Sequence, residues 1–286
     1  MQALFRKKYI NCGGKLISME QPRVMGIINI TPDSFFESSR VGSTQQLLDQ
    51  AEEMLKNGAS FLDIGGQSTR PGANLISAEE ELQRVIPAIT SLHKEFPEAL
   101  LSIDTFYSRV AQEAIDAGAC LINDISAGDA DEEMFPLLAK LKVPYIMMHK
   151  KGMPATMQEN PVYSNILLEI IDYFAAKTAQ LTALGVADVM IDPGFGFGKT
   201  LANNYELLQQ LDRFKLFELP VLVGISRKSM IQKVLGVSAA DSLNGTSALH
   251  MIALDRGASI LRVHDVKEAV QCVRLFESLV NIEKIH

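Results

Sequence analysis

Polar side chains that could bind or polarise a substrate follow short apolar runs along the whole chain. Carboxylate and amide oxygens come at or just after three of these runs, at Asp104, Asn123 and Asp192. Cations and other donors follow further runs, and these are Arg70, Arg227, Lys228, Arg262 and His264. Polar groups gathered at one rim would be costly to desolvate unless a polar ligand is recognised there. The residue types therefore predict a binding site.

The two sets of side chains favour different parts of one ligand. Buried carboxylates suit a planar heterocycle with two adjacent N–H donors, such as a cyclic guanidine, and Lys228 could meet the carbonyl of that ring. Arginine supplies paired donors to phosphate oxygens. We therefore predict a polar heterocycle that carries a phosphate or diphosphate, held by an acceptor half and a separate cationic half of the site.

Taken singly, these features have plainer explanations. An aspartate at a strand end often caps the next helix, and a lone histidine such as His149 is more often a core or rim residue than a ligand. Gly194, Gly196 and Gly198 lack the dinucleotide-binding spacing, and Pro193 stands where a phosphate-binding loop needs its first glycine. The sequence has no nucleophile elbow and no histidine-rich zinc set. Any metal is expected to be Mg²⁺ on the diphosphate.

The elements that would position these residues repeat as an apolar run, a polar loop and an amphipathic segment. The eight runs, read as buried parallel strands, are 24–30, 61–64, 100–103, 120–125, 144–148, 189–191, 220–225 and 259–263. The eight helical segments are 43–58, 77–92, 108–117, 131–141, 165–184, 203–212, 239–256 and 267–282. Capping boxes at Ser43 and Ser77 predict the starts of the first two helices.

This alternation predicts an α/β fold, a (β/α)8 TIM barrel with its working residues at the carboxyl ends of the strands. A doubly wound open sheet is the alternative, but it would usually carry a glycine fingerprint after the first strand. Residues 9–19 look like a short β-hairpin that could cap the bottom of the barrel. We expect a single domain over residues 1–286, with the motif-bearing core at about 22–282.

Composition and charge limit the partners. The net charge is −7 and no basic run occurs, which argues against nucleic acid as the main partner. No stretch approaches about 18 uninterrupted apolar residues, so no membrane span is expected. The three cysteines, Cys12, Cys120 and Cys272, are far apart and suggest reduced thiols in a cytoplasmic protein.

Five segments of the chain resemble the dihydropteroate synthase family. They are 28–35, 63–72, 192–199, 226–229 and 262–265. In order they read INITPDSF, DIGGQSTRPG, DPGFGFGK, SRKS and RVHD, and the similarity runs from about residue 22 to the C-terminus. Five motifs in this order are highly specific.

This resemblance implies a transferase of folate biosynthesis. Enzymes of the family join 6-hydroxymethyl-7,8-dihydropterin diphosphate to 4-aminobenzoate and release diphosphate and 7,8-dihydropteroate. Their mechanism is dissociative: diphosphate leaves first, and the substrate amine attacks the resulting cation. The resemblance also implies Mg²⁺ as cofactor, small-molecule substrates as partners, sensitivity to sulfonamides, and a homodimer.

The resemblance assigns roles residue by residue. The implied pterin-binding residues are Asp104, Asn123, Met147, Asp192 and Lys228. The implied diphosphate-binding residues are Asn29, Arg70, Arg262 and His264, and Asn29 would also reach Mg²⁺. The implied aminobenzoate-binding residues are Thr69, Pro71, Phe197 and Ser229. Catalysis would fall to Asp104, Arg70, Lys228, Arg262 and His264, with Asp104 stabilising the cation and the others acting on the leaving charge and the ring.

The chain departs from the family at two places. Gln67 stands where the family often has glutamate, and residues 36–40 differ from a small, glycine-rich stretch. Two other functions remain open. A methyltetrahydrofolate:corrinoid methyltransferase would share the acceptor cluster but would not need the diphosphate set. A catalytically silent barrel would bind a pterin and catalyse neither reaction.

Overall fold

The computed structural model describes residues 7–30, 40–67, 75–152 and 161–281. Eight parallel strands follow one another around the sheet in the order β8-β7-β6-β5-β4-β3-β10-β9. Their bounds are β3 Arg23–Asn29, β4 Phe61–Gly65, β5 Leu101–Asp104, β6 Leu121–Asp124, β7 Tyr145–Met148, β8 Val189–Asp192, β9 Leu222–Val223 and β10 Ile260–Val263. A parallel bridge between Ile191 and Val221 joins the two ends of this order. The sheet therefore closes into the predicted barrel, and the open-sheet alternative is wrong.

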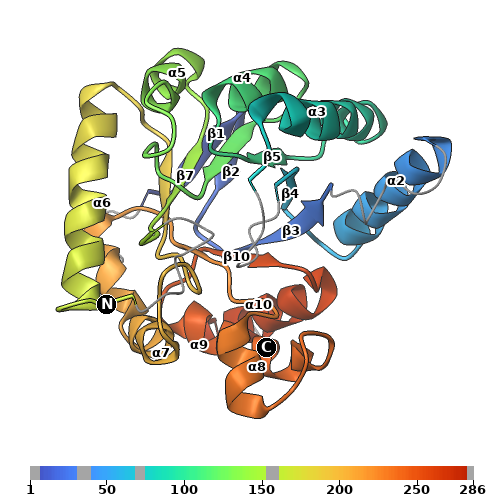
Figure 1. Cartoon of the computed structure of the whole chain (residues 1–286). Coiled ribbons are helices and arrows are strands. Elements are labelled where there is room, and N and C mark those ends of the chain that lie inside the picture. The colour runs from blue at the N-terminus through green and yellow to red at the C-terminus, as the bar shows by residue number, and fades with distance from the viewer. Residues whose placement is uncertain (1–6, 31–39, 68–74, 153–160, 282–286) are drawn as a thin grey trace.

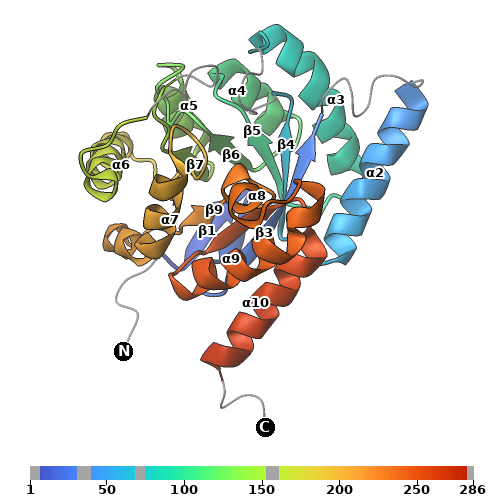
Figure 2. The same cartoon turned by 60° about the horizontal axis from the view of Figure 1, so that its bottom comes forward.

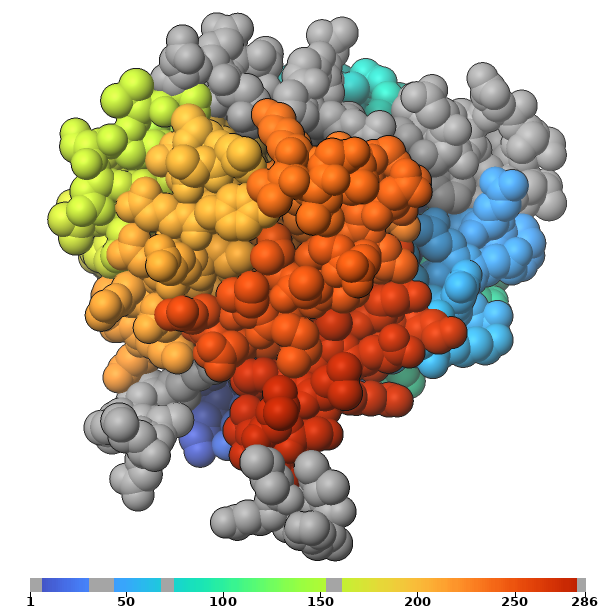
Figure 3. All heavy atoms as spheres, turned by 90° about the horizontal axis from the view of Figure 1, so that it is seen from below, coloured from blue at the N-terminus to red at the C-terminus, as the bar shows by residue number. Residues whose placement is uncertain are grey.

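Helices form the outer layer of the barrel (Figures 1 and 2). Their bounds are α2 Arg40–Lys56, α3 Ala78–Glu95, α4 Ser108–Asp116, α5 Met134–Leu141, α6 Ile166–Ala183, α7 Leu201–Gln209, α8 Ser229–Leu235, α9 Leu243–Asp255 and α10 Val266–Val280. Short 3-10 helices lie at Leu211–Phe217 and Ala240–Ser242. Seen from below, α8, α9 and α10 form one continuous face (Figure 3). None of the helices in the described ranges has the length and apolar character needed to cross a membrane.

The hairpin predicted over residues 9–19 is present as β1 (Tyr9–Cys12) and β2 (Lys15–Ser18), which pair antiparallel. Ile10, Cys12 and Met19 are buried in one cluster with Phe61 and Ile260. Phe61 and Ile260 are the first residues of their strands, so the hairpin covers the amino-terminal end of the barrel. The prediction that it caps the bottom is confirmed.

Two helix predictions need correction. Ser43 was predicted to cap the first helix, but α2 already begins at Arg40, so this capping signal located the helix only to within a turn. The seven-residue helix α8 was not predicted, because so short a segment shows no clear periodicity. By contrast, the hydroxyl of Ser77 accepts from the backbone N–H of Glu80, so Ser77 is the N-cap of α3 as predicted. The Glu80 carboxylate accepts from Arg84, and α3 has only the Ser77 half of the predicted box.

Candidate active site at the carboxyl ends of the strands

Three polar side chains form the centre of the site inside the barrel. Asp63, Asp104 and Asn123 come from β4, β5 and β6, and all three are buried. Asp104 is in register with Asn123, and side chains in register on neighbouring strands point to the same face. The amide nitrogen of Asn123 donates to Oδ2 of Asp63 over 2.9 Å. These strands therefore bring hydrogen-bonding oxygens to one wall of the interior.

Arg262 lies among these acceptors. Its Nε donates to Oδ2 of Asp63 over 2.6 Å, and its Nη2 donates to Oδ2 of Asp104 over 2.7 Å. Burial disfavours the charge of Arg262, but the two carboxylates outweigh this and raise its pKa. Burial raises the pKa of Asp104, and the Arg262 guanidinium opposes that rise. The predicted division into an acceptor half and a separate cationic half is therefore wrong at Arg262.

Asp192 and Lys228 face this cluster from β8 and the loop after β9. Burial raises the pKa of Asp192, and the positive charge of Lys228 opposes the rise. Burial also lowers the pKa of Lys228 to about 8, and Asp192 opposes that fall. The Lys228 ammonium donates to the carbonyl oxygen of Phe195 over 2.5 Å and lies 4.7 Å from the ring centre of Phe197. Acceptor, cation and aromatic ring thus meet at one point.

A second ion pair lies at the rim, where the chain leaves β9 and β10. Arg227 donates through Nε to Oδ2 of Asp265 over 2.9 Å and through Nη2 to Oδ1 over 2.5 Å. The backbone of Arg227 has a φ of 56°, in the left-handed region that residues other than glycine rarely adopt. The interpretation of Arg227 as a ligand-facing cation is therefore replaced by a role in shaping the turn before Lys228.

His264 lies at the same rim and is exposed. Desolvation by the surrounding protein lowers its pKa, and the positive charges of Arg262 and Arg227 lower it further. Its Nδ1 is 3.2 Å from the hydroxyl oxygen of Ser226, which itself accepts from the backbone N–H of His264. The Ser226 hydroxyl hydrogen is then available to Nδ1, which favours a neutral ring with its N–H on Nε2. His264 thus offers a hydrogen bond rather than a permanent charge.

The remaining predicted residues fall into three groups. Asn29 and Ser229 are exposed at the ends of β3 and the start of α8, and Phe197 is half-buried. Ser229 also lines a hollow of about 230 Å³ together with Lys199, Thr200 and Asn204. Met147 packs in the cluster between the sheet and the helices, whereas Met148 packs with Phe106 and Ile125 and is in register with Asp192. Met148 is therefore the interior methionine of β7. Thr69, Arg70 and Pro71 lie outside the described residues.

Two residues near the site were not among those predicted from the sequence. Asp63 is the one charged residue within the apolar run 61–64, and this unusual position is the signal that could have found it. Lys199 is the last residue of the DPGFGFGK segment, and it is buried and contacts His149. The interpretation of His149 as a satisfied buried histidine is in line with its 6% exposure and this contact.

The amide oxygen of Asn29 is a hard oxygen ligand of the kind that binds Mg²⁺. In the described ranges, no group of three or more His, Cys, Asp or Glu side chains is arranged to hold a metal ion. Mg²⁺ usually binds through one or two protein oxygens together with substrate phosphates and water, so Asn29 fits such a site.

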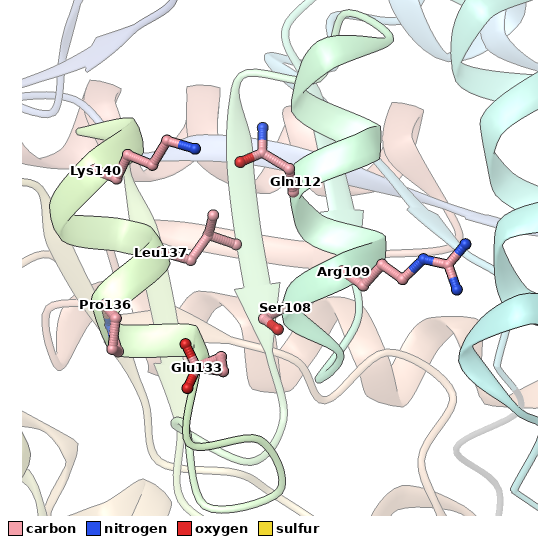
Figure 4. A pocket seen from close by; sticks show the side chains of 7 residues that line it. All are labelled: Ser108, Arg109, Gln112, Glu133, Pro136, Leu137 and Lys140. Atoms are coloured by element: carbon pink, nitrogen blue, oxygen red, sulfur yellow. The ribbon is translucent and has the colours of Figure 1, made fainter.

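A further hollow of about 390 Å³ lies on the outer layer, between α4 and α5 (Figure 4). It is lined by Ser108, Arg109, Gln112, Glu133, Pro136, Leu137 and Lys140. Arg109 forms surface ion pairs with Glu79 and Glu113. The hollow is separate from the strand ends and brings together none of the predicted site residues.

Comparisons with known proteins agree with this geometry. Residues 25–264 match the model of a family described as pterin binding enzyme. The dihydropteroate synthase of Escherichia coli K12 is 42% identical over 95% of this chain and 96% of its own length. The structure of Yersinia pestis dihydropteroate synthase in a sulfonamide complex has a TM-score of 0.89 and 41% identity, over 95% of this chain and 99% of that one.

Xanthomonas albilineans dihydropteroate synthase, solved with 4-aminobenzoic acid, has a TM-score of 0.88 and 36% identity, over 96% of this chain and 98% of that one. These similarities cover nearly the whole chain, and they hold for its sequence as well as for its fold. The chain therefore belongs to the dihydropteroate synthase family of pterin-binding enzymes.

Proposed function

We propose that this chain joins 6-hydroxymethyl-7,8-dihydropterin diphosphate to 4-aminobenzoate, with release of diphosphate and 7,8-dihydropteroate. The observation that carries the proposal is the buried set Asp104, Asn123 and Asp192 on the inner face of the barrel, with Lys228 beside it. A pterin ring displays N–H donors along one edge and a carbonyl next to them, which matches these acceptors and this cation.

The pterin would bind between the walls formed by Asp104, Asn123 and Asp192, with Lys228 donating to the ring carbonyl. Met148 would contact the ring in place of Met147, because it is the interior methionine. Asp63 would not need to touch the ring. Its contacts with Asn123 and Arg262 would keep both side chains in the orientation that the ring requires.

The diphosphate would bind near the rim, at Asn29, Arg70, His264 and the outer side of Arg262. Asn29 would hold Mg²⁺, which supplies positive charge for the leaving diphosphate oxygens when it is bound. His264 would donate from Nε2. The aminobenzoate would lie against Phe197 and Ser229, with Thr69 and Pro71 completing its pocket. Lys228 would be shared between the two substrates, since it already contacts the Phe197 ring.

The chemistry requires no nucleophilic side chain. The bond between the pterin methylene carbon and the diphosphate oxygen breaks, and the amine nitrogen of aminobenzoate then forms a bond to that carbon and loses a proton. Asp104 would stabilise the positive charge on the pterin during this interval, and Arg70, Arg262 and His264 would stabilise the leaving diphosphate. Burial of the ring keeps water from competing with the amine.

We also propose that the enzyme works as a cytoplasmic homodimer. Large apolar side chains are exposed on three adjoining helices, at Val234 and Leu235 of α8, Ile252 of α9 and Leu275 of α10. Such a group is typical of a surface covered by a second copy. Light scattering after size-exclusion chromatography should give the dimer mass, and Leu275→Glu should shift it toward the monomer.

The test of the function is turnover by purified protein with Mg²⁺ and both substrates. Diphosphate should appear in step with dihydropteroate, and a sulfonamide should compete with aminobenzoate. Omission of aminobenzoate is the matched control. If methyl transfer from methyltetrahydrofolate to a corrinoid occurs and no dihydropteroate forms, the methyltransferase alternative replaces this proposal. If neither reaction occurs although a pterin binds, the silent-barrel alternative replaces it.

A further inference from the structure

Lys199 is a lysine in an unusual place. It is 2% exposed, and lysine is rarely buried to that degree unless it is paired. Its Nζ has three partners: Nδ1 of His149 at 3.0 Å, the carbonyl oxygen of Phe197 at 3.1 Å and the carbonyl oxygen of His149 at 3.3 Å. No carboxylate is among these hydrogen-bond partners, so the side chain connects backbone rather than balancing a bonded charge.

The histidine is suited to receive this lysine. Burial lowers the pKa of His149 to about 2, and the positive charge of Lys199 lowers it as well. The imidazole is therefore neutral at physiological pH. Burial lowers the pKa of Lys199 to about 7, and in either protonation state its Nζ keeps N–H donors for Nδ1 of His149. Through this contact Lys199 ties the loop after β8, residues 193–199, to the loop after β7, which begins at His149.

The two loops are also in close backbone contact. Gly194 has a φ of 72°, and a Cβ there would lie 1.9 Å from the carbonyl oxygen of His149. Gly198 has a φ of 63°, and a Cβ there would lie 2.1 Å from the carbonyl oxygen of Lys151. Only glycine permits this approach. The Tyr163 hydroxyl and the Asn204 side chain hold the same loop from other sides, at Gly198 and Gly196.

The loop 193–199 also contacts the active site. Its Phe195 carbonyl accepts from Lys228, and its Phe197 ring lies over the same ammonium. Lys199 binds the carbonyl of Phe197, two residues along from the carbonyl that Lys228 binds. Lys199 and Ser229 also line one hollow. Two lysines therefore contact Phe197: Lys228 lies over its ring, and Lys199 binds its backbone carbonyl from the other side of the loop.

We propose that Lys199 is a positioning residue for the second substrate: it holds the 193–199 loop so that the Phe197 ring forms the wall against which the aromatic amine packs. This inference rests on the proposed function, and Lys199 is not one of the residues proposed to touch either substrate. A buried lysine is costly compared with an apolar side chain of similar length. Its retention here is explained by the carbonyl oxygens that a methionine could not bind.

The test compares Lys199→Met and Lys199→Gln with wild type. The methionine keeps the length and loses every donor, whereas the glutamine keeps an amide donor. Steady-state kinetics should give a KM for 4-aminobenzoate that rises roughly tenfold in Lys199→Met, as for loss of about one buried hydrogen bond. The rise should be smaller in Lys199→Gln. Calorimetric binding of a pterin without diphosphate should stay within about twofold of wild type.

Lys233→Met is the matched control, because Lys233 lines the same hollow but is exposed. It should leave both constants unchanged. An unchanged KM for aminobenzoate in the Lys199 variants overturns the inference, and so does an equal loss of affinity for pterin and aminobenzoate. If Lys199→Met does not fold, Lys199→Gln alone decides by the same criteria. Failure of the wild-type protein to form dihydropteroate would instead count against the proposed function.

Discussion

The Arg262 guanidinium donates to Asp104 over 2.7 Å, across the interior of the barrel from β10 to β5. The same guanidinium binds Asp63 on β4. Arg262 is therefore a shared counter-ion of two buried carboxylates, and it holds Asp104 in place before any ligand arrives. Preorganised groups of this kind stabilise charge without further rearrangement during the reaction.

Acidic and basic side chains lie together around this contact. Asp63, Asp104 and Asp192 are acidic, and Arg262 and Lys228 are basic. Burial raises the pKa of Asp104 to about 7, so this carboxyl can lose its proton near neutral pH. The ionised Asp104 beside the pterin suits a reaction in which positive charge develops on that ring.

Arg262→Met should destabilise the fold strongly. Removing one partner of a buried ion pair leaves uncompensated charge, at a cost of about 3–5 kcal/mol, and here two carboxylates are left. Urea unfolding of the single variant measures the loss. Asp63→Asn combined with Arg262→Met removes one of the stranded charges and should recover part of it. A single variant within about 1 kcal/mol of wild type would contradict this account of the cluster.

The sequence predicted the barrel and the residues at its rim because both leave local signals. Continuous apolar runs indicate strands buried on both faces, and the polar residues that end them must meet at one end of a parallel barrel. Asp104 and Asn123 come together in this way. The hairpin at the bottom was equally local, since Tyr9–Cys12 and Lys15–Ser18 are joined by Gly13 and Gly14.

The parts that could not be predicted depend on side chains that cross the barrel. Asp63 and Arg262 are 199 residues apart, and nothing in either segment indicates that they pair. The choice between Met147 and Met148 failed for a related reason. In a continuous apolar run the two faces look alike, so the sequence does not indicate which methionine points inward, and an error of one residue exchanges the faces.

The protonation of Lys228 should set the alkaline limit of ligand binding. Burial lowers its pKa to about 8, so above that pH the ammonium becomes a neutral amine and loses its attraction to Asp192. Calorimetric affinity for a pterin ligand should therefore fall as pH rises from about 7 to 9. Lys228→Met should bind weakly and lose this pH dependence. A fall of the same size in the variant would assign the alkaline limit to another group.

The hairpin should support the fold without affecting catalysis. Ile10 is fully buried at the amino-terminal end of the barrel, opposite the site. Ile10→Ala should lower the free energy of unfolding by about 2–5 kcal/mol, as for other large-to-small core changes. Both substrates should keep their KM values below the melting transition. Leu16→Ala is the matched control, because Leu16 is an exposed residue of the same hairpin and should change stability little. A shift in either KM for Ile10→Ala would show that the hairpin influences the strand ends.

Glu81 should make the fold less stable as the pH rises. This α3 carboxyl is fully buried, accepts from the Thr105 hydroxyl over 2.8 Å, and has a second oxygen without a partner in the described structure. Burial raises its pKa from about 4.5 to about 7. The folded state then binds the proton more tightly than the unfolded state, so stability falls between about pH 4.5 and 7 and levels off above.

Glu81→Gln cannot ionise and still accepts from Thr105. In urea unfolding it should match wild type near pH 5 and exceed it at pH 8, by up to about 3 kcal/mol. Glu79→Gln, on the exposed side of the same helix, should follow wild type at both pH values, and identical pH profiles for all three proteins would mean that Glu81 is ionised in the fold at little cost.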